Sequence, residues 1–118
     1  DILRGREIKI LGDGTPYRSY LYAADLAIWL WTILLKGEVG EAYNVGSDDS
    51  ISIEALAHRV VELSASKVSV NVLQKPKEHA LSSRYIPDIS KARKGLDLDV
   101  YIGLDDSILR TLVWNCVN

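Results

Sequence analysis

The chain has 118 residues, of which 47% are hydrophobic and 25% charged, and its formal net charge is −2. This length suits one domain with a modest core, and the slightly acidic balance offers no basic surface for nucleic acid and no cationic helix for a membrane surface. A single cysteine, Cys116, forms no internal disulfide, which is typical of a reducing cytoplasm. We therefore expect a cytoplasmic protein with neither a nucleic-acid nor a membrane partner. Because the chain contains no methionine, we also expect Asp1 to be an internal residue of a longer polypeptide.

The first part of the chain predicts two short strands joined by a tight turn. Apolar residues favour a strand over 8–11. Two glycines and a proline favour a turn over 12–16, because glycine adopts conformations barred to other residues and proline fixes φ. Aromatic residues predict a second strand over 19–22. The hydrophobic period then changes at Ala23, where we expect a helix to begin.

This helix is predicted to run from Ala23 to Lys36 and to stop at Gly37, since a cation and a glycine are typical of a helix C-terminus. Residues 26–35 include one polar side chain, Thr32, so we expect protein to enclose the helix on nearly every side. The run is about half of the ~20 apolar residues that cross a bilayer, which argues against a membrane span. Enclosing such a helix requires more protein than this chain readily supplies.

The remaining patterns predict further short strands and helices. Ser52 is the natural N-cap of one helix and Asp88 of another. In chain order, we expect a buried strand over 42–46, a polar turn over 47–50, an amphipathic helix over 53–63, a strand with one wet face over 68–72, a polar loop over 75–83, an extended segment over 84–87, a short helix over 89–94, and a final helix from Asp105 or Asp106 with Ile108, Leu109, Leu112, Val113 and Cys116 on one face. The predicted fold class is α/β, with short strands and about four helices in a single unit over 1–118.

Features of a self-contained catalytic centre are missing from the sequence. One cysteine and two separated histidines, His58 and His79, form no metal-ligand cluster. No serine lies in the strand-turn-helix setting of a nucleophile elbow. No GxGxxG loop follows a strand, so the chain has no dinucleotide cradle of its own. We expect no catalytic residue, no metal ligand and no unaided NAD binding.

Five short motifs in a fixed order carry a resemblance to a known family. They are Arg18-x-Tyr20-x-Tyr22-Ala23-x-Asp25, Tyr43-Asn44-Val45-Gly46, Ser52-Ile53-x-x-Leu56, Arg84-Tyr85-x-Pro87-Asp88-x-Ser90-Lys91-Ala92, and Thr111-Leu112-Val113-Trp114. Together they resemble the C-terminal part of the extended short-chain dehydrogenases, the NAD-dependent epimerase/dehydratase family that acts on nucleotide sugars. The resemblance covers nearly the whole chain.

The resemblance implies the substrate-binding C-terminal portion of an extended Rossmann-type enzyme. NAD and a Tyr-x-x-x-Lys pair would belong to an N-terminal domain that is absent from this chain, so the chain alone would be inactive. The implied activity is that of a dTDP-glucose 4,6-dehydratase, with a UDP-sugar 4-epimerase or a nucleotide-sugar decarboxylase as alternatives. The implied partner is a nucleotide sugar, and the parent enzyme would be a homodimer.

The same resemblance implies substrate-binding roles for three residues. Arg18 matches an arginine that contacts the substrate phosphate or ribose, and a guanidinium presents planar donors to phosphate oxygens. Ser52 matches a position near the nucleotide, although capping alone would explain it. Arg84 ends a loop that touches diphosphate in relatives. This sequence departs from the family pattern there, since Glu78 stands where an arginine is expected.

Several matching positions have simpler explanations. Arg84, Lys75 or Lys77 could replace the missing loop arginine, or the loop could point elsewhere. We expect Asp25 and Asp88 to cap helices, and Tyr20 and Tyr22 to serve in packing. A non-enzymatic alternative is an interaction module that associates with itself through the helix over 23–36.

Overall fold

The computed structural model describes residues 1–76 and 81–117. The elements, in order, are η1 (Ile2–Arg4), β1 (Ile8–Ile10), β2 (Tyr17–Arg18), α1 (Ala23–Lys36), β3 (Ile51–Ser52), α2 (Ile53–Leu63), β4 (Val70–Val72), β5 (Arg84–Tyr85), α3 (Ser90–Leu96) and α4 (Leu104–Val117). Over these residues the fold is α/β with short strands and four α-helices, as the sequence predicts.

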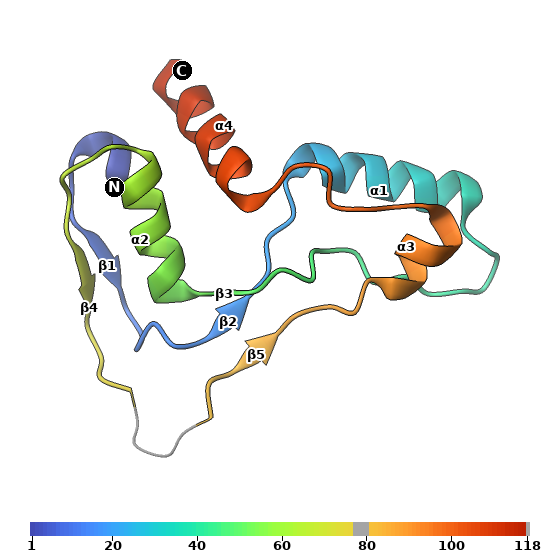
Figure 1. Ribbon diagram of the computed structural model, residues 1–118, viewed down its shortest axis with the longest axis horizontal. Coiled ribbons are helices and arrows are strands. Elements are labelled where there is room, and N and C mark those ends of the chain that lie inside the picture. Colours follow the sequence, from blue (N-terminus) through green and yellow to red (C-terminus); the bar gives the residue numbers. More distant parts are fainter. Residues whose placement is uncertain (77–80, 118) are drawn as a thin grey trace.

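The molecule is a thin, open slab of 47 × 44 × 16 Å (Figure 1). At one end, α2 packs on a two-stranded parallel sheet in which β1 pairs with β4. At the other end, α1 packs against α3. Between them lies a three-stranded sheet in the order β3-β2-β5, which is antiparallel between β2 and β3 and parallel between β2 and β5.

A small core lies where α1 meets α3 and the segment that leads to α4. Trp29, at 0% exposure, contacts Ile89, Ala92, Leu96 and Leu98 in one buried cluster. The indole Nε1 of Trp29 donates a 2.9 Å hydrogen bond to the carbonyl oxygen of Asp99. One aromatic side chain therefore fixes the C-terminal segment beneath α1.

Two helix predictions are confirmed residue for residue. α1 runs from Ala23 to Lys36, and the backbone N–H of Gly37 closes it by donating to Ile33 O at 2.8 Å. A Cβ built on Gly37 would lie 2.4 Å from that same carbonyl oxygen, so the helix end requires glycine for space. α2 runs from Ile53 to Leu63.

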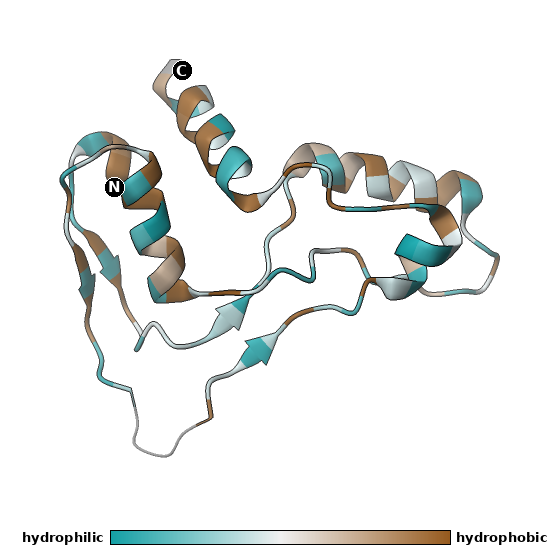
Figure 2. Ribbon diagram, in the orientation of Figure 1, coloured by the Kyte–Doolittle hydropathy of each residue, from teal (hydrophilic) through white to brown (hydrophobic). Residues whose placement is uncertain are grey.

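The predicted enclosure of α1 is wrong for this chain. Only Asp25 and Trp29 of the helix are buried. Its other side exposes Leu30, Trp31, Leu34 and Leu35, at 53 to 76%. Figure 2 shows the hydrophobic residues along α1. The slab is too thin to surround a helix, because α3 and the segment before α4 cover one side only.

Two predicted strands, over 19–22 and 42–46, are wrong, and they flank α1 in the sequence. β2 occupies Tyr17–Arg18, earlier than the predicted 19–22, because only these residues pair with both neighbours. Residues 42–46 form no strand, since no other strand of the described chain pairs with them. Tyr43 and Val45 nevertheless pack partly buried against the Trp29 cluster, as their apolar character predicts.

The last two helices depart from prediction in detail. α3 extends through Gly95 to Leu96 and does not stop at the glycine. α4 begins at Leu104, and of its predicted apolar face only Ile108 and Leu112 are half-buried. Leu109, Val113 and Cys116 are exposed.

Candidate anion-binding surface

The three-stranded sheet brings together all three residues that the sequence assigns to substrate binding. Tyr17 of β2 pairs with Ser52 on one side and with Arg84 on the other. Arg18 follows Tyr17 on the same strand, pairing with Ile51 and Tyr85. Because successive side chains of a strand point to opposite faces, Arg18 starts from the opposite face to Ser52 and Arg84.

The turn before β2 holds this sheet against the start of α2. The N–H of Ile53 donates to Pro16 O at 3.1 Å, and that of Glu54 donates to Gly14 O at 3.0 Å. Gly14 has a φ of +73°, and a Cβ there would lie 2.8 Å from the Cβ of Glu54. The turn therefore needs glycine both for its conformation and for space.

Arg84 is held by an aromatic ring and a hydroxyl group. Its guanidinium carbon lies 4.6 Å from the ring centroid of Tyr17, and its Nη2 donates to Ser50 Oγ at 3.1 Å. Arg18 turns back along its own strand, where Nη1 donates to Tyr17 O at 2.7 Å and to Ser83 O at 3.4 Å. Each guanidinium keeps donor groups beyond these contacts, since guanidinium has five.

Neither arginine forms an ion pair with a carboxylate of the described chain, residues 1–76 and 81–117. Elsewhere, Arg59 is paired with Asp105 and Glu62, and Arg93 with Asp48 and Asp99. Two guanidinium groups on neighbouring strands, without a carboxylate partner among the described residues, make this sheet a place where an anion would be attracted.

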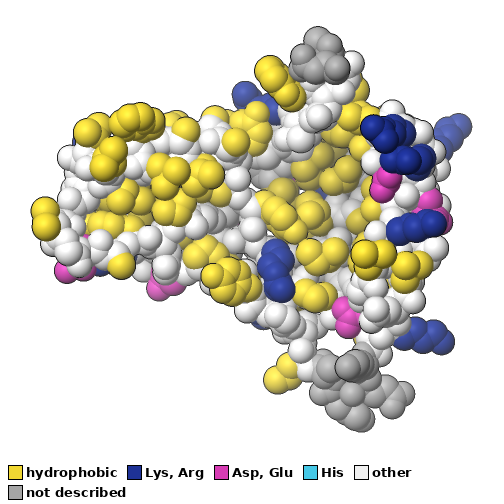
Figure 3. Space-filling model, turned by 180° about the vertical axis from the view of Figure 1, so that it is seen from behind, with side chains coloured by type: hydrophobic (Ala, Val, Ile, Leu, Met, Phe, Trp, Pro, Cys, Tyr) yellow, Lys and Arg dark blue, Asp and Glu magenta, His cyan; other side chains and the backbone are white. Residues whose placement is uncertain are grey.

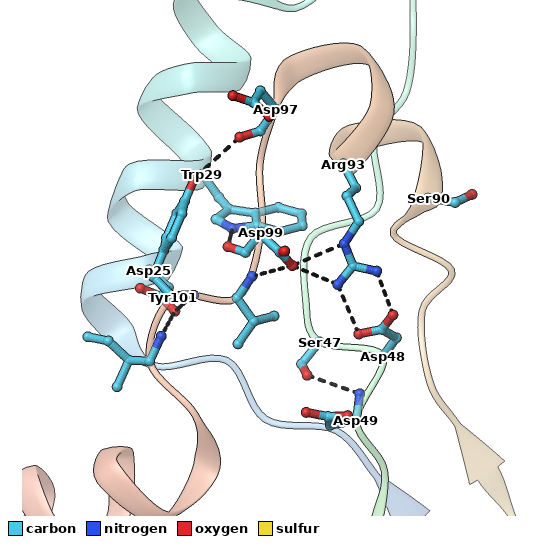
Figure 4. Close-up of polar contacts among 12 residues, drawn as sticks. Asp25, Trp29, Ser47, Asp48, Asp49, Ser90, Arg93, Asp97, Asp99 and Tyr101 are labelled. Carbon is cyan, nitrogen blue, oxygen red and sulfur yellow. Dashed lines mark hydrogen bonds and ion pairs between the residues drawn. The ribbon is translucent and has the colours of Figure 1, made fainter.

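Arg93 illustrates the opposite, structural use of the same side chain (Figure 4). Its Nη1 donates to Asp48 Oδ2 and its Nη2 to Asp99 Oδ1, each at 2.7 Å. These bonds raise the pKa of Arg93 and hold the pKa values of both carboxyl groups below their usual range. Arg93 therefore ties the loop before β3 to the segment before α4 and has no charge left for a ligand.

Ser52 caps α2, as the sequence predicts, since its Oγ accepts from the N–H of Ala55 at 3.1 Å. Its proposed contact with a nucleotide stays a prediction. Asp88 is not the N-cap residue of α3, which is Ile89, but its Oδ1 accepts from the N–H of Ser90, the first residue of α3, at 2.9 Å, and this bond lowers the pKa of Asp88.

The capping role predicted for Asp25 is wrong. Asp25 is 1% exposed, and its Oδ2 accepts from the N–H groups of Tyr101 and Ile102, both at 2.9 Å (Figure 4). The carboxylate thus anchors the approach to α4, not its own helix. Sequence offers no signal for this role, because the partners lie 76 and 77 positions away.

Other predicted positions contribute less to the surface. Lys77, Glu78 and His79 lie outside the described residues, and Lys75 is exposed. Tyr20 and Tyr22 line a hollow of about 1040 Å³ between η1, α2 and α4. Among the described residues no three His, Cys, Asp or Glu side chains form a metal site, and none of the described helices is long and apolar enough to span a membrane.

A smaller hollow lies next to Arg84. It has a volume of about 300 Å³ and is lined by Tyr20, Ser47, Asp49, Ser50, Ile51, Val100 and Leu104. Its Ser50 is the residue that holds Arg84. Sequence reasoning treated 47–50 as a polar turn and missed that it forms the wall beside Arg84.

Comparison with known proteins places these features in a family context. The profile of the NAD dependent epimerase/dehydratase family matches residues 1–46. A trifunctional UDP-glucose 4,6-dehydratase/epimerase/reductase from Arabidopsis thaliana is 29% identical over 98% of the chain, and dTDP-D-glucose 4,6-dehydratase from Mus musculus is 41% identical over 49% of it.

Solved structures share this fold. The crystal structure of UDP-glucose 4-epimerase from Thermotoga maritima with UDP-glucose covers 98% of the chain with a TM-score of 0.85 and 23% identity. The chain spans 37% of that protein, and 17% and 16% of the two curated relatives.

Proposed function

We propose that the chain is part of a longer enzyme of the NAD-dependent epimerase/dehydratase family, whose model matches residues 1–46, and that its three-stranded sheet holds the nucleoside diphosphate of a nucleotide sugar. The observation that carries the proposal is the pair of guanidinium groups, Arg18 and Arg84, on adjacent strands with no carboxylate partner in the described chain. A diphosphate has the charge and the oxygen acceptors that these donors require.

The chemistry of the enzyme would lie outside this chain. In the proposed enzyme, NAD held by a separate Rossmann domain would supply hydride transfer at the sugar. This chain contributes orientation, since binding the remote nucleotide fixes the sugar before reaction. No residue of this chain is assigned a catalytic role.

The preferred activity is that of a dTDP-glucose 4,6-dehydratase, and we propose a homodimer for the parent enzyme. The 41% identity to the mouse dehydratase, over 49% of the chain, supports the activity. A UDP-sugar enzyme, either a 4-epimerase or a decarboxylase, is the second candidate, and the match of the Arabidopsis UDP-glucose dehydratase over 98% of the chain favours the uridine nucleotide.

Arginine substitutions in the full-length parent enzyme test the proposal. Arg18→Ala should lower kcat/KM by about 10- to 150-fold, equivalent to about 1.5–3 kcal/mol for a lost hydrogen bond to a charged group. Arg18→Lys should recover part of that loss, since it keeps the charge without the planar fork. Arg4→Ala, on η1 at the far end of the slab, is the control. Equal kinetics for Arg18→Ala and Arg4→Ala would remove Arg18 from the binding surface.

A further inference from the structure

Arg93 joins two carboxylates that come from different segments of the chain. Its Nη1 and Nη2 donate to Asp48 at 2.7 and 3.3 Å, and its Nε and Nη2 donate to Asp99 at 3.0 and 2.7 Å (Figure 4). Asp48 lies in the loop before β3, and Asp99 lies between α3 and α4. A guanidinium binds two carboxylates at once because its donors form a rigid planar fork.

The two segments that Arg93 joins form two walls of the hollow of about 300 Å³ beside Arg84. The loop that contains Asp48 lines it with Ser47, Asp49, Ser50 and Ile51, and the segment that contains Asp99 leads to Val100 and Leu104 on the other wall. Arg93 therefore sets how far apart the two walls lie, without lining the hollow itself.

Hydrogen bonds connect both carboxylates to their walls. On the loop side, the N–H of Asp49 donates to Oγ of the buried Ser47 at 3.1 Å. On the other side, the N–H of Val100 donates to Asp99 Oδ1 at 2.9 Å, and the carbonyl oxygen of Asp99 accepts from Trp29. A shift of either carboxylate would therefore carry its wall with it.

The loop wall includes the residue that holds Arg84. Ser50 follows Asp48 by two positions, and its Oγ accepts from Arg84 Nη2 at 3.1 Å. The other contact of this guanidinium is the ring of Tyr17, whose centroid lies 4.6 Å away. A ring face attracts a cation without fixing its rotation, whereas a hydrogen bond has a preferred direction. Ser50 therefore decides where the remaining donors of Arg84 point.

We propose that Arg93 is a positioning residue: through Asp48 and Ser50 it holds the guanidinium of Arg84 in one orientation on the anion-binding surface. The importance of that orientation for a diphosphate rests on the proposed function. Arg93 acts on the ligand only through Arg84, because its own charge is already paired with two carboxylates. An arginine that is oriented beforehand loses less conformational entropy when an anion binds, which raises affinity.

Arg59 provides a matched comparison. It is also paired with two carboxylates, Asp105 and Glu62, and its side chain is 37% exposed, against 39% for Arg93. Arg59 joins α2 to α4, and α2 lies at the opposite end of the slab from α3 (Figure 1). Figure 3 shows Lys and Arg side chains gathered over that end. Replacing Arg59 therefore removes the same charge and a similar set of ion pairs without releasing the loop beside Arg84.

The UDP affinity of the full-length parent enzyme tests the proposal. Arg93→Gln should weaken UDP binding about threefold to tenfold, and less than about 1.5-fold in an Arg84→Ala background, because residues that act through one another are not additive. Arg93→Lys should recover little of the loss, since lysine keeps the charge without the fork. Arg59→Gln should leave the affinity unchanged in both backgrounds.

Chemical modification of the ligand-free enzyme reports on Arg84 directly. Phenylglyoxal reacts with accessible arginine side chains, and peptide mass spectrometry follows the modification of Arg84. Arg93→Gln should speed this reaction about threefold or more, as expected for a lost hydrogen bond, whereas Arg59→Gln should not. Ser50→Ala should also speed it, because it removes the acceptor of Arg84 and leaves the ion pairs of Arg93 intact.

Two outcomes would overturn the proposal. One is an Arg93→Gln enzyme in which Arg84 reacts at the parent rate. The other is an equal loss of UDP affinity with and without Arg84, which would show that Arg93 acts by another route. If Arg93→Gln does not fold, an unchanged modification rate of Arg84 in Ser50→Ala contradicts the proposal.

The same measurements separate this inference from the proposed function. Faster modification of Arg84 in Arg93→Gln, together with an unchanged UDP affinity in Arg84→Ala, would keep the positioning role and refute the phosphate-binding role of Arg84. A large loss of UDP affinity in Arg84→Ala, with parent modification rates in Arg93→Gln, would do the reverse.

Discussion

Asp25→Ala should destabilise the chain by about 2–3 kcal/mol. Its carboxylate accepts two hydrogen bonds from backbone N–H groups, of Tyr101 and Ile102, at 2.9 Å each. Hydrogen bonds to a charged group contribute about 1.5–3 kcal/mol each, or about 3–6 kcal/mol for two. The second oxygen, Oδ1, is buried without a partner among the described residues, and relieving its desolvation returns about 1–3 kcal/mol of this loss.

Urea unfolding followed by tryptophan fluorescence measures this change, since Trp29 is fully buried beside Asp25 on α1. The midpoint should fall while the m-value stays the same. Asp106→Ala is the matched control, because Asp106 pairs with Arg110 at the surface, where both side chains are 53% exposed, and should cost less than about 0.5 kcal/mol. An Asp25→Ala variant as stable as Asp106→Ala would show that the anchor contributes nothing.

Three further predictions concern caps, turns and pH. Ser52→Ala removes the α2 cap and should cost about 1 kcal/mol in the same urea assay; a loss below about 0.3 kcal/mol would dismiss the cap. Gly14→Ala should cost about 1–3 kcal/mol, because it places a Cβ against Glu54 at a positive φ, and an unchanged midpoint would contradict this. The pKa values of Asp48 and Asp99 are lowered in the folded state by Arg93, so the stability they confer is fully present above their unfolded pKa of about 4 and is lost as pH falls through the lowered folded values. In Arg93→Gln, the free energy of unfolding should fall less steeply between pH 5 and about 2. An equally steep fall would show that other groups cause the loss of stability in acid.

Local chemistry was sufficient to predict the elements whose ends depend on neighbouring residues. Ser52 and the apolar spacing after it define α2, since a cap acts within three positions. The change of period at Ala23 and the stop at Gly37 define α1 in the same way. The three binding candidates came from motif order, and the sheet then placed them on adjacent strands, with Ser52 and Arg84 on one face and Arg18 starting from the other.

Long-range contacts decided the rest, because no local pattern encodes them. The sequence by itself determined the helices, the turn at Gly14 and the apolar character of 26–35 and 42–46. Only the tertiary structure decided that Arg18 and Arg84 have no carboxylate partner among residues 1–76 and 81–117 while Arg93 has two, and that Asp25 anchors residues 76 and 77 positions away. It also decided that 42–46 is left unpaired, since a strand exists only where a second strand supplies its hydrogen bonds.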